Sequence, residues 1–177
     1  MQPFIIGFVG RSGAGKTTLA VQVAKELVSR GWRVVALKDA HHGIDLDRPG
    51  KDTWRYREAG AMRVILRTAE RWAVMSETPQ GATPVEELLK LAGDAEIVLV
   101  EGFKHEGAFP RIEVRRQAVA NEPPLFGRNA PQEARAKLVA VATDFDEPEF
   151  MGTKKLDVND PKAVADFIES MRAQRCA

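Results

Sequence analysis

A glycine-rich segment near the N-terminus constrains this sequence more than any other feature. It consists of Gly10, Arg11, Ser12, Gly13, Ala14, Gly15, Lys16 and Thr17, with Thr18 immediately after it. These residues match the pattern G-x-x-x-x-G-K-[ST] of phosphate-binding loops. The preceding run, 4–9, is short, apolar and β-rich, which predicts a buried strand. Over 17–30, apolar residues recur every three to four positions, which predicts an amphipathic helix.

The residue types of this loop suit a nucleoside triphosphate with Mg²⁺. Glycines allow positive φ angles, so that successive backbone N–H groups can point at one phosphate. The N-terminus of the following helix adds the positive end of its dipole. We expect Lys16 to reach the β- and γ-phosphates and the Thr17 hydroxyl to bind Mg²⁺. The sequence thus predicts a nucleotide-binding site built on residues 10–18.

Two carboxylates follow predicted strands and are candidates for the same site. Residues 97–100 form a continuous apolar run that ends in Glu101, and Asp39 follows the predicted strand 33–37. In a parallel sheet the carboxyl ends of the strands meet at one edge, where α/β proteins bind ligands. We expect Glu101 to hold Mg²⁺, directly or through water, and Glu101 or Asp39 to orient the attacking water. The alternatives are a surface carboxylate for Glu101 and a turn residue for Asp39.

The rest of the chain predicts a three-layer α/β fold of the P-loop NTPase type, with a mostly parallel sheet. We interpret 1–177 as one domain in which a β-hairpin, about 62–75, is inserted. Further strands are expected at 111–115 and 138–143, and helices at 52–60, 83–93 and from residue 160 onward. Asp52 is expected to cap the first of these helices, and Thr83 and Glu86 to form a capping box with Pro84 at the first helical position. The segment 117–135 is rich in Asn, Pro and Arg, which predicts the most mobile loop.

Composition excludes several classes of protein. In 177 residues, 26 Lys and Arg oppose 25 Asp and Glu, a net charge of +1, which gives no overall reason to expect a nucleic-acid partner. A single cysteine, Cys176, excludes an intrachain disulfide framework and a multi-cysteine zinc site. No apolar run is long enough for a membrane span or a signal-peptide core, so we expect a cytoplasmic protein.

The polar segment 38–52 has three interpretations. It holds two histidines, four aspartates and three basic residues. It is a loop that contacts phosphate or substrate, a metal site built from His41 or His42 with Asp45 and Asp47, or a solvated loop. Between residues 48 and 71, seven Lys and Arg oppose three acidic residues, which favours an anionic ligand or an acidic partner.

Several motifs occur in an order that resembles a known family. They are the loop 10–17, Lys-Asp-Ala-His-His at 38–42, the segment 45–52, Glu-Ala-Gly-Ala at 58–61, Val-Glu-Gly-Phe-Lys at 100–104, Ile-Glu-Val at 112–114 and Asp-Val-Asn-Asp at 157–160. Together they resemble the molybdopterin-guanine dinucleotide biosynthesis protein B (MobB) family. The resemblance extends over nearly the whole chain.

The resemblance implies a cytoplasmic, homodimeric GTP-binding protein with weak GTPase activity. Such a protein assists a guanylyltransferase, MobA, that joins GMP to the molybdenum cofactor, and direct contact with the pterin cofactor remains open. It implies nucleotide-binding roles for Gly13, Gly15, Lys16, Thr17 and Thr18, and a magnesium-side role for Glu101. Members often have histidine where this chain has Asp39. The choice of guanine rests on the resemblance, because the guanine motif [N/T]-K-x-D has only a near match at 154–157.

The residues leave other functions open. A small-molecule kinase would use Asp39 as its base and the basic residues of 48–71 to hold an anionic acceptor. A metallochaperone GTPase would deliver a metal through His41, His42 and nearby acids. A module that only binds a nucleotide is a further alternative.

Overall fold

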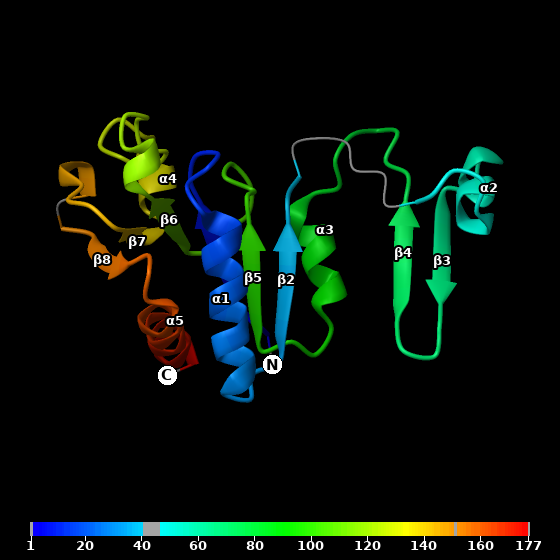
Figure 1. Ribbon diagram of the computed structural model, residues 1–177, viewed down its shortest axis with the longest axis horizontal. Coiled ribbons are helices and arrows are strands. Elements are labelled where there is room, and N and C mark those ends of the chain that lie inside the picture. The colour runs from blue at the N-terminus through cyan, green and yellow to red at the C-terminus, as the bar shows by residue number, and fades with distance from the viewer. Residues whose placement is uncertain (1, 41–46, 151, 177) are drawn as a thin grey trace. The chain divides into compact units, whose positions relative to one another are not determined.

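The computed structural model describes residues 2–40, 47–150 and 152–176, and Figure 1 shows the arrangement of its elements. The strands are β1 (Phe4–Val9), β2 (Val34–Lys38), β3 (Arg63–Arg67), β4 (Trp72–Ser76), β5 (Ile97–Glu101), β6 (Arg111–Arg115), β7 (Leu138–Thr143) and β8 (Lys154–Asp157). The helices are α1 (Lys16–Ser29), α2 (Asp52–Glu58), α3 (Val85–Leu89), α4 (Gln132–Arg135) and α5 (Pro161–Cys176), with 3₁₀ turns η1 (Lys90–Ala92), η2 (Gln117–Val119) and η3 (Pro148–Phe150). The chain divides into two compact units: unit 1, residues 1–39 and 85–177, and unit 2, residues 40–84.

Unit 1 contains a six-stranded sheet in the order β2-β5-β1-β6-β7-β8. All neighbouring strands of this sheet are parallel, and Figure 1 shows β2 and β5 side by side with their arrows in one direction. Lys38 of β2 and Phe8 of β1 are both in register with Glu101 of β5. The carboxyl ends of the central strands therefore lie at one edge, directly beside the loop that follows β1. The predicted mostly parallel α/β fold is confirmed.

Each face of this sheet is covered by its own apolar cluster. Along β5, Ile97 and Leu99 join a cluster with α1 and α5, whereas Val98 and Val100 join a second cluster with α3 and Phe109. Successive side chains of a strand point to opposite faces, so this alternation places helices on both sides of the sheet. The expected three layers follow because the first four residues of β5 are all apolar and alternate between the two faces of the sheet.

Unit 2 contains α2 and an antiparallel hairpin of β3 and β4, which confirms the predicted insertion. The turn has no Asn-Gly pair. Instead, the Thr68 hydroxyl accepts hydrogen bonds from the backbone N–H groups of Glu70 and Arg71, at 3.2 and 3.1 Å. A threonine side chain thus closes a hairpin that its turn sequence signals only weakly. The expectation of one domain for the whole chain stays a prediction.

Two local expectations are wrong, and one strand was not predicted. The N-cap of α2 is Lys51, so Asp52 lies in the first turn, where it complements the helix dipole, rather than at the cap. Helix α3 begins at Val85, one residue after Pro84, so the proline precedes the helix; the Val85 N–H donates to the Glu106 carboxylate at 3.3 Å. The short strand β8 was not expected at all, because Lys154 and Lys155 interrupt its apolar pattern. Of the helices described, none is long and apolar enough to cross a membrane.

Candidate nucleotide-binding site

The glycine-rich loop connects β1 to α1 with the backbone angles that its sequence predicts. Gly10, Gly13 and Gly15 have φ values of 148°, 76° and 81°. A Cβ atom at Gly10 would lie 2.4 Å from the carbonyl oxygen of Val114, so the loop passes β6 at a distance that only glycine allows. Gly15 is the N-cap of α1, and within the described chain no side chain caps this helix. The N–H groups of its first turn are thus left for a ligand.

Lys16, the first residue of α1, folds back over the loop. Its Nζ donates a hydrogen bond to the carbonyl oxygen of Arg11 at 2.8 Å. Burial lowers the pKa of Lys16, Glu101 opposes this shift, and the positive charges of Lys38 and Lys104 lower the pKa further. Lys16 therefore experiences the charges of two further lysines and one carboxylate. An anion placed there would gain favourable interactions with all of these lysines.

Thr17, Glu101 and Lys38 meet beside Lys16. The Thr17 hydroxyl donates to Glu101 Oε1 at 2.6 Å, and the Lys38 ammonium lies 3.2 Å from the Thr17 oxygen. Lys38 also forms an ion pair with Glu101. The parallel register of β2 and β5 sets this contact, because Lys38 is the direct partner of Glu101 in the sheet. The structure thus brings together the two residues, Thr17 and Glu101, that the sequence assigned to Mg²⁺.

The oxygen donors of this cluster fit Mg²⁺. Magnesium prefers carboxylate, hydroxyl and water oxygens and uses one or two carboxylates together with nucleotide phosphates. The pair Thr17 and Glu101 already accommodates one positive charge, the ammonium group of Lys38. Across the parts of the chain that the structure describes, no group of three or more His, Cys, Asp or Glu could hold a metal ion. A magnesium ion here would accordingly take most of its ligands from phosphate and water.

Asp39 lies at the same edge of the sheet. Its backbone N–H donates to the carbonyl oxygen of Glu101 at 2.9 Å. A Cβ atom at Gly102, whose φ is 90°, would lie 2.8 Å from the Cβ of Asp39, so the two chain segments pass in close contact. The predicted position of Asp39 is confirmed, while its role in orienting water stays a prediction.

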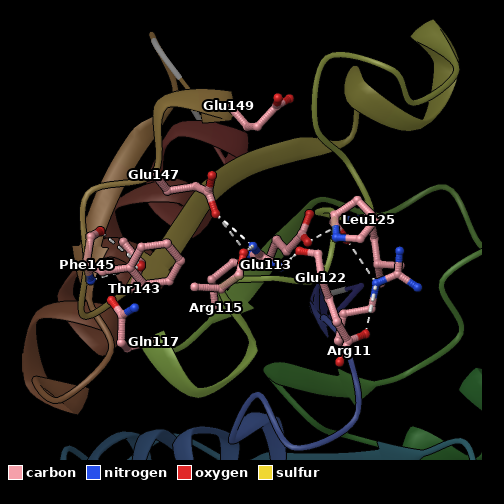
Figure 2. A network of polar contacts seen from close by, with 12 residues as sticks. Arg11, Glu113, Arg115, Gln117, Glu122, Leu125, Thr143, Phe145, Glu147 and Glu149 are labelled. Atoms are coloured by element: carbon pink, nitrogen blue, oxygen red, sulfur yellow. Dashed lines mark hydrogen bonds and ion pairs between the residues drawn. The ribbon is translucent and has the colours of Figure 1, made fainter.

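The segment 117–135, predicted to be the most mobile loop, is tied to β6 and to the phosphate loop (Figure 2). The carboxylate of Glu113 accepts hydrogen bonds from the backbone N–H groups of Leu125 and Phe126 at 2.7 and 2.8 Å. Burial raises the pKa of Glu113, although these two N–H groups and the charges of Arg115 and Arg11 oppose the shift. A buried carboxylate therefore serves as the anchor of this segment.

Two arginines complete the attachment of this segment. Arg115, fully buried on β6, forms an ion pair with Glu147 at 2.8 Å and donates to the carbonyl oxygen of Glu122 at 2.8 Å. Arg11 of the phosphate loop donates to the carbonyl oxygen of Pro123 at 2.9 Å. Figure 2 shows these side chains converging from the loop, β6 and the segment after β7. The composition of 117–135 predicts mobility because the residues that hold this segment, Glu113, Arg115 and Arg11, lie outside it in the sequence.

The remaining candidates of the sequence come from the segment 41–47. His41, His42 and Asp45 lie outside the described residues. In unit 2, Asp47 accepts a hydrogen bond from the Thr53 hydroxyl at 2.6 Å and pairs with Arg57 at 3.3 Å. Its carboxylate is thus already used in holding α2.

Sequence reasoning assigned no role to two residues that lie at the loop, Lys38 and Arg116. Lys38 was visible as the last residue of a strand next to the strand of Glu101. Arg116 directly follows β6, and a Cβ at Gly15 would lie 2.8 Å from its Nε. The signal was the basic pair Arg115-Arg116 at the end of an apolar strand.

The sheet order and the glycine-rich loop define a protein of the α/β class with a P-loop-like fold. The family of molybdopterin guanine dinucleotide synthesis protein B (MobB) matches residues 5–144. The chain is 40% identical over 170 residues to the molybdopterin-guanine dinucleotide biosynthesis adapter protein of Haemophilus influenzae, covering 94% of this chain and 88% of that one. It is 35% identical over 169 residues to the protein of the same name from Escherichia coli, covering 93% and 90%. This chain therefore belongs to the MobB family.

A solved structure agrees with this assignment at the level of the fold. The crystal structure of a molybdopterin-guanine biosynthesis protein B superimposes with a TM-score of 0.68 at 24% identity, covering 95% of this chain and 99% of that one. The likeness supports the same arrangement of strands and helices.

Proposed function

We propose that this chain is a GTP-binding adapter protein that acts in the cytoplasm in the biosynthesis of molybdopterin guanine dinucleotide. Membership of the MobB family supports the pathway, and two relatives carry the name of adapter proteins for it. One observation supports nucleotide binding above all: Lys16, Thr17 and Glu101 lie together at a loop with two left-handed glycines. Guanine is favoured over adenine because the family's product contains a guanine nucleotide.

The binding mechanism is electrostatic. The N–H groups of residues 13–18 and the ammonium of Lys16 offset the negative charge of the phosphates. Thr17 and Glu101 would hold Mg²⁺, which supplies further positive charge against the phosphate oxygens when it is bound. Binding would draw the Lys16 ammonium from the Arg11 carbonyl to the phosphates, so the cation is placed before the ligand arrives. Glu101 and Asp39 would orient the attacking water.

We propose that hydrolysis is slow. The Glu101 carboxylate already accepts the Thr17 hydroxyl and pairs with Lys38, so little of it is left to orient a water molecule. An adapter needs nucleotide affinity more than turnover. Steady-state GTP hydrolysis by the isolated protein faster than about 1 s⁻¹, a typical enzyme rate, would contradict this role.

The partner we propose is a guanylyltransferase of the MobA type, and the assembly is a homodimer. The hairpin of unit 2 supports an interface, because Ile65 and Trp72 are 68% and 65% exposed on one face of it. Apolar side chains gathered on an exposed strand pair are typical of contact surfaces. A pterin cofactor carried by the partner is a further ligand in reach of such an assembly.

One experiment tests the partner and the nucleotide together. Tagged protein is mixed with the guanylyltransferase in the presence of GTP or ATP with Mg²⁺, and retained enzyme is measured. We expect retention of the enzyme, and displacement of bound labelled GTP by unlabelled GTP but not by an equal concentration of ATP. Absence of retention would refute the adapter role, and equal displacement by ATP would refute the preference for guanine.

A further inference from the structure

Arg116 lies across the phosphate loop. It follows β6 directly, and a Cβ atom at Gly15 would lie 2.8 Å from its Nε, 3.4 Å from its Cδ and 3.9 Å from its Cζ. Gly15 is the N-cap of α1 and immediately precedes Lys16. The guanidinium group is thus placed against the backbone at which the helix begins.

The ends of two further strands hold Arg116 in this position. Its Nη1 donates to Asn159 Oδ1 at 2.8 Å, just after β8, and to Asp144 Oδ2 at 3.2 Å, just after β7. Asp144 also accepts a hydrogen bond from the Gln117 N–H at 2.8 Å, and the Asn159 N–H donates to Asp157 Oδ1 at 2.8 Å. The anchors are therefore themselves fixed, which lowers the entropy that Arg116 loses when it binds a ligand.

This anchoring leaves part of the guanidinium available. Both hydrogen bonds use Nη1, and among residues 2–40, 47–150 and 152–176 no acceptor is bonded to Nε or Nη2. The side chain of Arg116 is 27% exposed. An arginine held at one nitrogen, with its Nε beside a phosphate loop, is arranged to bind an oxyanion.

We propose that Arg116 binds the α- or β-phosphate of the nucleotide, with Asp144 and Asn159 as its positioning residues. This inference rests on the proposed function, because it names a further contact of the same nucleotide. The backbone of a phosphate loop surrounds the α- and β-phosphates, whereas its lysine reaches the β- and γ-phosphates. Since Arg116 lies against the backbone of Gly15 rather than beside Thr17 and Glu101, its contact is present with GDP and GTP alike.

The test compares the affinities of GDP and GTP for variants of Arg116 by calorimetry with Mg²⁺ present. A hydrogen bond to a charged group contributes about 1.5–3 kcal/mol, so Arg116→Ala is expected to lower both affinities about 10- to 150-fold and by the same factor. Arg116→Lys keeps the charge but loses the planar fork, so it should recover part of the loss for both nucleotides. Arg33→Ala is the matched control, because Arg33 is likewise held by two side chains, through ion pairs with Asp94 and Glu96, but precedes β2, at the other end of the strand from Lys38. It should bind as wild type does.

A double-variant comparison tests the positioning residue. Asn159→Ala should lower the affinity for GDP and GTP less than Arg116→Ala does. In the Arg116→Ala background it should cause no further loss, because its effect passes through the guanidinium. Additive losses would mean that Asn159 acts independently, and would overturn its role as a positioning residue.

The outcomes separate this inference from the function on which it rests. If wild type binds no purine nucleotide, the proposed function fails. If wild type binds and Arg116→Ala binds equally well, the role of Arg116 is refuted. A loss confined to GTP would also overturn it, because the contact would then be with the γ-phosphate. Should Arg116→Ala fail to fold, Arg116→Lys and Asn159→Ala decide by the same comparison.

Discussion

Unit 1 and unit 2 bury their apolar side chains in different ways. In unit 1, β5 alone contributes four buried side chains to two clusters, one on each face of the sheet. In unit 2, Val64 is the one buried apolar residue among those described. Six of the nine large apolar side chains that are exposed in the described structure belong to unit 2: Tyr56, Met62, Ile65, Leu66, Trp72 and Val74.

This difference in burial indicates different roles for the two units, support of the phosphate loop in unit 1 and an exposed apolar face in unit 2. The strands of unit 1 are covered on both faces, which gives the phosphate loop a rigid support and fixes the register that brings Lys38 to Glu101. A two-stranded hairpin with one short helix has little core of its own and is marginal in water. Its exposed apolar face is the surface at which we propose contact with another chain. The proposed nucleotide site and the proposed contact surface thus belong to different units.

Matched truncations of an apolar side chain in each unit test this comparison most strongly. Leu19→Ala removes a fully buried side chain of α1 and is expected to lower the free energy of unfolding by about 2–5 kcal/mol. Ile65→Ala, on the exposed face of the hairpin, is expected to change it by no more than about 0.5 kcal/mol in dilute protein. Urea denaturation of the two variants measures both values. Equal losses would show that the hairpin carries a core as unit 1 does.

Removal of the loop lysine tests whether the nucleotide site belongs to unit 1. Lys16→Ala is expected to lower the affinity for GTP about 100-fold or more, because two phosphates lose a charged hydrogen-bond donor. Lys25→Ala, an exposed lysine of the same helix, is the control and should bind GTP as wild type does. Calorimetry with Mg²⁺ gives both affinities, and undiminished binding by Lys16→Ala would place the nucleotide elsewhere.

The anchor of segment 117–135 should make stability depend on pH. Because burial raises the pKa of Glu113 above its ordinary 4.5, the folded protein holds this proton more tightly than the unfolded chain does. Folding then takes up a proton above pH 4.5, so this contribution to stability falls as pH rises through the raised pKa. We therefore expect the free energy of unfolding of wild type, minus that of Glu113→Gln, to decrease as the pH rises over that range. A difference that does not vary with pH would contradict the raised pKa.

The smallest effect is expected when substitutions in unit 2 are tested for their effect on GTP affinity, which we assign to unit 1. Trp72→Ser combined with Val74→Ser replaces apolar side chains of the exposed face. The GTP affinity per chain should stay unchanged, while light scattering should show single chains in place of the proposed homodimer. Loss of GTP affinity without a change in mass would mean that the hairpin serves the nucleotide site.

Much of unit 1 could be predicted because each of its signals is local. The strand before the loop, the glycines and Lys16 lie within thirteen residues, and their order fixes the loop's geometry. The position of Asp39 beside Glu101 followed from parallel topology alone. In unit 1, hydrophobic periodicity and the residue types of turns therefore predict the strand, the loop and the helix that follows it.

What could not be predicted depends on contacts between distant segments. Glu113 anchors residues 125–126, and Arg116 is held by Asp144 and Asn159, which follow two later strands. No local pattern marks such pairs, because the partners are separated by 12 to 43 residues in the sequence. Strand β8 could not be predicted for a related reason: Leu156 is its one buried residue, so the sequence has no apolar run there.

The most direct test of the central claim is a titration of the unmodified protein with GTP in the presence of Mg²⁺. The phosphate loop described here predicts saturable heat with one GTP bound per chain and weaker binding of ATP. A titration that shows no saturable binding of any purine nucleoside triphosphate would contradict the claim that this loop holds a nucleotide.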